Sequence, residues 1–142
     1  MMDQADHTFA SVSPLVVGEE AVWYEFCREH RLMIQRCIDC GNHQFPPRSV
    51  CQQCLADEVE WVEASGKGTI FSFTVQHRGP LDFADQTPYA IVMVDLDEGP
   101  RMMSRFVGPI EDAAVGLVVG LRWAESGDEL TLPVFVAAAS DI

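Results

Sequence analysis

The sequence predicts a mainly β protein in which an N-terminal helix and a small cysteine-bearing ribbon precede a five-stranded barrel. Three observations support this fold class. A helical pattern of apolar residues comes first, two C-x-x-C pairs follow it, and the second half alternates apolar and polar residues with the period of two that strands require. The expected units are a flexible arm (1–16), the N-terminal helix (17–35), the ribbon (36–64) and the barrel domain (65–142).

Residues 19–34 have the pattern of an amphipathic helix. Glu19 and Glu20 lie in the expected first turn and Arg28 near the end, where the helix dipole favours each charge. The apolar stripe of this helix must pack either on the protein's own core or on a partner subunit, and the sequence leaves both open. If the stripe is a docking face, its contact residues are Val22, Trp23, Phe26 and Met33.

The two C-x-x-C pairs predict a metal site. Two cysteines that flank a tight turn can present both sulfurs to one ion, and a second such turn completes a tetrahedron. Gly41 lets the first turn bend back, so that its amides can point at the sulfurs. Four protein ligands leave no position for water, so we expect a structural zinc ion, although an all-sulfur site also suits iron. The expected ligands are Cys37, Cys40, Cys51 and Cys54.

A disulfide framework is the alternative interpretation of these cysteines. It requires an oxidising compartment, whereas residues 1–6 have neither the basic nor the apolar region of a signal peptide, so we expect a cytoplasmic protein. Cys27 lies outside the pattern and is expected to be a buried apolar thiol. His30 is expected in the core or at its boundary, since the cysteines already satisfy the metal. Arg36 and Arg48 could offset the thiolate charge or be ordinary solvated arginines.

The remaining sequence predicts a barrel. In the first barrel strand, Phe71, Phe73 and Val75 are expected to share one face. Gly116 and Gly120 would relieve crowding where a strand bends, and Pro133 confines the last strand to an edge or a bulge. Five short strands and one long loop, at 76–88, fit a Greek-key barrel of the OB type, with a jelly roll or sandwich as the alternative. Strands are expected at 58–63, 69–75, 89–96, 101–107, 116–123 and 130–137.

Composition excludes several functions. The formal charge is −13, from 22 acidic and 9 basic residues, which repels nucleic acid. No run approaches the roughly 18 apolar residues that a membrane helix needs. No histidine stands beside a Ser or Cys nucleophile in a recognisable motif, and the carboxylate pairs at 82 and 85 and at 95 and 97 are typical of solvated loops. We therefore expect no catalytic residue.

The motifs, taken in order, resemble those of the acyl-CoA-associated family of zinc-ribbon plus OB-fold proteins, formerly a domain of unknown function. The resemblance covers roughly residues 20 to 137. It implies a rubredoxin-like zinc ribbon and an OB-fold barrel in a non-catalytic accessory subunit. It also implies a hetero-oligomer with a thiolase-like, acyltransferase, aldolase-like or hot-dog-fold enoyl-CoA hydratase partner. The motifs are Cys37-x-x-Cys40-Gly41, Phe45-Pro46-Pro47-Arg48, Cys51-x-x-Cys54, Gly66-Lys67-Gly68, Pro88-Tyr89, Glu98-Gly99-Pro100-Arg101 and Leu132-Pro133-Val134-Phe135.

Acyl-CoA binding would need cations for the phosphates and an apolar track for the pantetheine and acyl chain. The same residues could equally lie against a partner enzyme, where Arg and aromatic side chains make strong contacts. Two further hypotheses are a stand-alone acyl-CoA-binding protein and a nucleic-acid-binding OB-fold protein. The candidate acyl-CoA or partner contacts are Arg78, Phe83, Tyr89, Arg101 and Arg105, with Met102 and Met103 as further apolar candidates.

Overall fold

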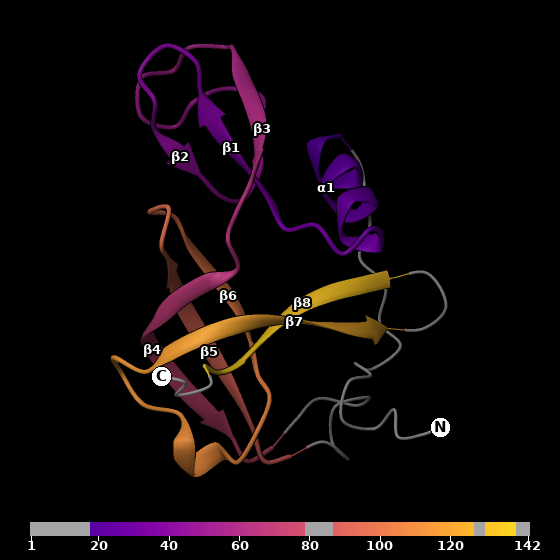
Figure 1. Ribbon diagram of the computed structural model, residues 1–142, viewed down its shortest axis with the longest axis vertical. Helices are drawn as coiled ribbons and strands as arrows, with labels where there is room; N and C mark the ends of the chain where they lie inside the picture. The colour runs from indigo at the N-terminus through magenta and orange to yellow at the C-terminus, as the bar shows by residue number, and fades with distance from the viewer. Residues whose placement is uncertain (1–17, 79–86, 127–129, 139–142) are drawn as a thin grey trace.

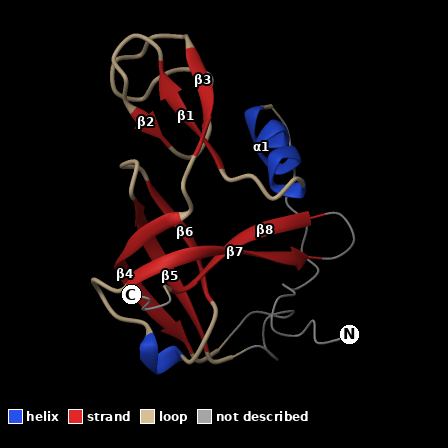
Figure 2. Ribbon diagram, viewed as in Figure 1, coloured by secondary structure: helices blue, strands red, loops and turns tan. Residues whose placement is uncertain are grey.

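The computed structural model describes residues 18–78, 87–126 and 130–138 (Figure 1). The ribbon sheet lies at one end of the molecule and the barrel at the other, with the N-terminal α-helix beside both (Figures 1 and 2). This confirms the predicted fold class. The elements are α1 (Glu19–Arg28), β1 (Met33–Cys37), β2 (His43–Gln44), β3 (Val59–Glu63), β4 (Lys67–Gln76), β5 (Tyr89–Leu96), β6 (Arg101–Phe106), a 3-10 turn (Ile110–Asp112), β7 (Val118–Ser126) and β8 (Leu130–Ala137). None of the helices among these residues is long and apolar enough to cross a bilayer.

Helix α1 begins at Glu19, as its acidic first turn predicts, but it ends at Arg28, so the predicted extent to residue 35 is wrong. His30 has a left-handed backbone, with φ at 60°. Its N–H donates to Cys27 O at 2.8 Å, and the next amide, of Arg31, donates to Phe26 O at 3.0 Å. These two bonds form the helix-ending motif that usually contains glycine, and here histidine takes the glycine position.

The ribbon is a three-stranded antiparallel sheet in the order β2-β1-β3. Its interior contains two glutamines, Gln35 and Gln44, each only 1% exposed. Gln44 Nε2 donates to Gln35 Oε1 at 2.8 Å, and Gln44 Oε1 accepts from Gln52 N at 2.8 Å. Gln35 Oε1 also accepts from Arg48 N at 2.7 Å. The loop between the cysteine pairs is therefore bound to β1 by satisfied buried amides, which suits their position because an unpaired buried amide is costly.

The second sheet is a closed barrel in the order β4-β5-β6-β8-β7, the strand order of an OB fold. Strand β4 pairs with both β5 and β7, and β7 pairs with β8 along its length. The barrel closes between β6 and β8 through one parallel register pair, Phe106 with Phe135. That closure is the shortest ladder of the barrel.

A bulge in β4 corrects the predicted strand face. The register with β5 shifts between Ile70 and Ser72, which leaves Phe71 as the extra residue. Ile70 is buried in the core, whereas Phe71 is 48% exposed. Phe73 pairs with the buried Val92 after the bulge, so Phe71 and Phe73 do not share one continuous face.

One hydrophobic core joins the helix to the barrel. Trp23 and Cys27 of α1 belong to the same buried cluster as Ile70, Val92 and Phe135 of the barrel. His30 stacks on Trp123 of β7, with ring centroids 5.3 Å apart and an interplanar angle of 8°. The inner side of the helical stripe therefore packs on the protein's own core.

The glycine that crowding requires is Gly68. A Cβ there would lie 2.6 Å from Val94 Cγ1 and 2.7 Å from Asp95 O, closer than real contacts allow. A Cβ on Gly120 would meet no heavy atom within 4 Å, and neither would one on Gly116, whose φ is 92°. The expectation that crowding demands glycine at 116 and 120 is therefore wrong.

Substituting Gly68→Ala should lower the free energy of unfolding by roughly 1–3 kcal/mol, because the methyl group overpacks against the β5 main chain. Gly120→Ala is the matched control in a neighbouring strand. It should leave stability unchanged or raise it by up to about 1 kcal/mol, since it restricts the unfolded chain without a clash. Urea unfolding of both variants checks this, and equal effects would contradict the role assigned to Gly68.

Burial raises the pKa of the Cys27 thiol to about 12. Below pH 9 the thiol is neutral in both the folded and the unfolded chain. Above pH 9 only the unfolded chain ionises, so this residue should reduce the free energy of unfolding by roughly 1.4 kcal/mol per pH unit. Urea unfolding at pH 8 and pH 10 should show a larger fall for the wild type than for Cys27→Ala. An equal fall in both proteins would count against a raised pKa of the Cys27 thiol.

Candidate metal centre and adjoining groove

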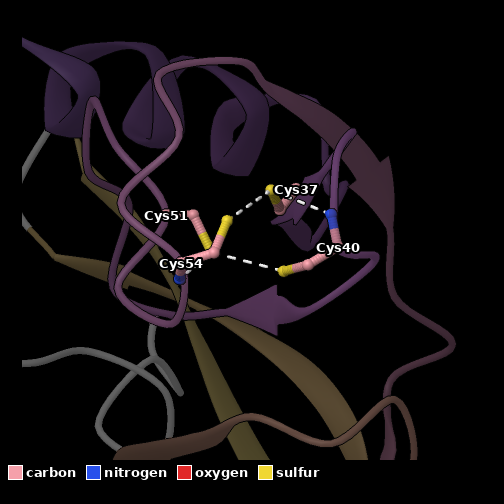
Figure 3. A group of neighbouring side chains, drawn as sticks. All are labelled: Cys37, Cys40, Cys51 and Cys54. Atoms are coloured by element: carbon pink, nitrogen blue, oxygen red, sulfur yellow. Dashed lines mark hydrogen bonds between the residues drawn. The ribbon is translucent and has the colours of Figure 1, made fainter.

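The four predicted cysteine ligands converge at the tip of the ribbon (Figure 3). Cys37 and Cys40 bracket the turn after β1, while Cys51 and Cys54 bracket the second turn. The Cys37 and Cys54 sulfurs are 3.6 Å apart, those of Cys40 and Cys51 are 3.7 Å apart, and all four lie within 4.8 Å of one another. Sulfurs bound tetrahedrally at about 2.3 Å lie roughly 3.8 Å apart, so the site fits zinc.

The two turns repeat the same hydrogen bonds. Gly41 N donates to Cys37 O at 2.9 Å, and Leu55 N donates to Cys51 O at 2.9 Å. The amides of Cys40 and Cys54 each donate to the first sulfur of their own pair at 3.4 Å. Amides that point at sulfur stabilise thiolates and orient them toward the metal. Leu55 adopts a φ of 68° to take the position that glycine takes in the first turn.

The close packing of the four sulfurs shifts the pKa values of the thiols in opposite directions. The Cys54 N–H is the main cause that lowers the pKa of Cys51 to about 6. At Cys54, the Ala56 N–H lowers the pKa, but the contact with Cys37 and burial outweigh it and raise the pKa to about 12. Neighbouring thiols cannot all ionise without compensation. A divalent cation removes this conflict because it binds all four as thiolates.

The recorded hydrogen bonds of the two arginines near the cysteines do not go to the thiolates. Arg36 Nη1 donates to Glu60 Oε2 at 2.9 Å, across the β1–β3 pair. Arg48 is exposed, and its backbone N–H binds Gln35. With four protein ligands and no open position, the centre can hold the fold but cannot activate water.

Substituting Cys40→Ser or Cys51→Ser should abolish stoichiometric zinc and disorder the ribbon. Structural zinc contributes about 10–16 kcal/mol of apparent binding energy that is also folding energy. Metal analysis by mass spectrometry and the dispersion of the ribbon amides in NMR spectra check this. Cys27→Ser, outside the cluster, should keep its zinc. A melting temperature unchanged by chelation would contradict a structural role for the metal.

An apolar groove of about 500 Å³ lies where the helix, the ribbon and the barrel meet. The helix contributes aromatic side chains, the ribbon contributes a Phe-Pro-Pro loop, and strands β5, β6 and β8 form the floor. Its lining includes no cysteine or histidine. Ser104 Oγ, a hydroxyl in the floor, donates to Pro133 O at 2.8 Å. The lining residues are Glu20, Trp23, Tyr24, Phe45, Pro46, Pro47, Tyr89, Ile91, Met102, Met103, Ser104, Arg105, Leu132 and Pro133.

Two of the predicted contact residues, Tyr89 and Arg105, meet in this groove. The Arg105 guanidinium lies over the Tyr89 ring, 4.8 Å from its centroid. Burial lowers the pKa of Arg105, and the Coulomb effect of Tyr89 partly opposes this shift. The groove thus places one half-buried cation on an aromatic wall, with Met102 and Met103 beside it.

Of the other predicted contact residues, Arg101 and Arg78 do not line the groove. Arg101 Nε donates to Asp95 Oδ1 at 2.6 Å, and its guanidinium covers Phe71 at 3.5 Å from the ring centroid, outside the groove lining. Arg78 is exposed just after β4. Phe83 lies outside the described residues. The structure therefore does not bring the five candidates into one site.

The predicted docking stripe is also divided. Val22 is 42% exposed, and Phe26 is partly buried against Trp61, with ring centroids 5.5 Å apart. Trp23, 7% exposed, packs on the core and lines the groove, and Met33, 5% exposed, belongs to β1 rather than to the helix. The assignment of Trp23 and Met33 to an exposed helical stripe is therefore wrong.

Sequence reasoning missed most of the groove. Tyr24 and Ile91 carry no local pattern that distinguishes them from core residues, and the Phe45–Pro47 segment was noted only as part of a family motif. The signals that the sequence did offer were the candidate contacts Tyr89, Met102, Met103 and Arg105, and Pro133, whose missing N–H predicted an irregular edge in the last strand. That edge forms part of the groove floor.

These features define a class of two-module proteins, in which a closed four-cysteine ribbon is joined to an OB-fold barrel. Residues 25–60 match the family described as ChsH2, rubredoxin-like zinc ribbon domain. Residues 61–124 match the family described as ChsH2, C-terminal OB-fold domain. The chain belongs to this ChsH2 (DUF35) family of zinc-ribbon and OB-fold proteins, and its ribbon is a zinc ribbon.

Relatives of the chain are named as subunits and scaffolds. It is 38% identical to a probable enoyl-CoA hydratase alpha subunit of Thermomonospora curvata over 86% of this chain, and it spans 38% of that protein's length. It is 35% identical to a DUF35 domain-containing scaffold protein of Methanocaldococcus jannaschii, covering 75% of this chain and 79% of the relative. A solved structure described as Ltp2-ChsH2(DUF35) aldolase has a TM-score of 0.81, with 36% identity over 89% of this chain and 100% of that chain.

Proposed function

We propose that this protein is a non-catalytic accessory subunit of an acyl-CoA-processing enzyme of the thiolase-like, acyltransferase, aldolase-like or enoyl-CoA hydratase class. It docks on the enzyme subunit through the groove and borders that subunit's acyl-CoA site. The observation that carries this proposal is the groove itself. It is an apolar groove built from all three elements, and its lining has no nucleophile paired with a base.

The naming of relatives supports the same proposal. A hydratase subunit, a scaffold protein and an aldolase complex share this architecture, so the ribbon and barrel recur beside different chemistries. A part that recurs with different chemistries is expected to bind or position rather than to react. The assembly we propose is a hetero-oligomer, and its small-molecule ligand is the acyl-CoA of the partner.

A stand-alone acyl-CoA-binding protein is the second candidate, because Arg105 and Tyr89 place a cation at the edge of an apolar groove. Calorimetry of the full chain with octanoyl-CoA distinguishes the two. Micromolar binding without a partner favours the stand-alone protein, and its absence favours the accessory subunit.

The accessory role is tested by affinity purification of the full chain from its native cells, with mass spectrometry of the proteins that co-elute. An acyl-CoA enzyme should co-elute in a fixed ratio. Met103→Asp should weaken the complex by about tenfold or more, because Met103 is 66% exposed in the groove and a carboxylate there must be desolvated.

Val118→Asp is the matched control, since Val118 is 56% exposed on β7 and does not line the groove. It should leave the complex intact, and both variants should keep their zinc. A wild-type chain that elutes alone would count against the proposal. So would a complex that Met103→Asp leaves unchanged, because it would remove the groove from the docking surface.

A further inference from the structure

The closed barrel has a single register pair between β6 and β8, Phe106 with Phe135, and we call the line between these strands beyond that pair the seam. At the closed end, Val107 N donates to Phe135 O at 2.8 Å. Alternate residues of a strand point their main-chain groups to the same edge, so Met103 presents its N–H and C=O to this seam and not to β5. A parallel ladder that continued along the seam would need residue 133 to donate an N–H to the Met103 carbonyl.

Pro133 prevents that continuation because it has no N–H. Its carbonyl, which would accept from β6 in such a ladder, instead accepts from the Ser104 hydroxyl at 2.8 Å. The ladder is accordingly confined to the single pair farther along. Among the described residues, no register pair joins Met103 to β8, and Met103 lines the groove.

The surroundings of this open edge are apolar. Met102, Met103 and Leu132 line the floor, and the walls are aromatic rings and prolines from the helix and the ribbon. Main-chain groups in an apolar setting are stable only when hydrogen-bonded. An occupant that supplies its own amide groups, in an extended conformation, would satisfy both the edge and the walls.

The charge of the groove selects among such occupants. Its lining has one cation, Arg105, and one acid, Glu20. The whole chain carries −13, so a phosphate-bearing ligand would find little compensation here. An uncharged peptide needs none, and grooves lined by aromatic rings and prolines suit extended peptides.

We propose that the groove binds an extended, uncharged peptide segment of the enzyme subunit, which adds a strand to the open edge of β6 at Met103. The peptide exchanges main-chain hydrogen bonds with Met103, and its alternate side chains pack on the aromatic and proline walls. The identity of this partner rests on the proposed function, whereas the peptide-binding edge rests on the seam alone.

The test uses the full zinc-loaded chain and a phage-displayed library of random twelve-residue peptides. We expect enrichment of uncharged peptides that are rich in apolar residues. Met103→Pro should reduce their affinity by at least about tenfold, because it removes the N–H that faces the seam. Met103→Ala is the matched control, since it shortens the side chain but keeps the N–H, and it should reduce affinity less than about threefold.

Amide hydrogen exchange of the wild-type chain gives a second measurement that no variant can confound. The Met103 amide should become protected when a selected peptide binds. The β5–β6 ladder should persist in Met103→Pro, because proline is tolerated where the N–H faces away from the neighbouring strand.

Three results would overturn the proposal: no enrichment, equal losses for the two Met103 variants, or displacement of the peptide by octanoyl-CoA together with protection of the same amide. The last result would assign the groove to the thioester. An enzyme complex that forms normally with Met103→Pro would refute the added strand and leave the accessory function standing. Peptide binding by a chain that captures no acyl-CoA enzyme would refute the accessory function and leave the peptide-binding edge standing.

Discussion

The four-sulfur site is the constraint on which the ribbon and everything next to it depend. The ribbon has a thin apolar core, and its centre holds the hydrogen-bonded pair of Gln35 and Gln44. Such a small module gains too little from apolar burial to fix its own loops, so metal binding must supply the difference. Because Gln44 also binds Gln52 N, the strands and the second cysteine turn are ordered together.

That order extends from the metal to the groove. The loop between the two cysteine pairs carries Phe45, whose ring lies 5.4 Å from the Trp23 ring. Trp23 in turn belongs to the core that α1 shares with the barrel. A metal ion that has no chemistry of its own thus sets the position of one groove wall, through a loop whose other face contacts the helix.

The sequence predicted the parts of this protein that depend on spacing and period. The cysteine ligands follow from two short motifs, and the strands β3 to β8 follow from alternation and turn residues. The end of the helix was not predicted, because His30 adopts a left-handed backbone without being glycine. The apolar run through Ile34 therefore continued the helical pattern into residues that form strand β1. The bulge at Phe71 was not predicted, because an extra residue leaves the alternation of the sequence intact on each side. The groove was not predicted, because its walls come from segments that are distant in the chain.

The bulge at Phe71 and the proline at 133 have opposite consequences for the protein surface. The bulge turns Phe71 outward, where the Arg101 guanidinium covers its ring and Asp95 holds that guanidinium in place. The exposed apolar ring is thereby partly covered, as edges and surfaces of stable sheets tend to be. At the seam, Pro133 removes a donor, and the Ser104 hydroxyl bonds to the Pro133 carbonyl across the two strands. A residue with an N–H at 133 could form one further main-chain bond, to the Met103 carbonyl, and would stabilise the barrel by that bond. The proline gives up a ladder bond where the barrel borders the apolar groove, and this coincidence is the reason for proposing that the irregular strand serves binding.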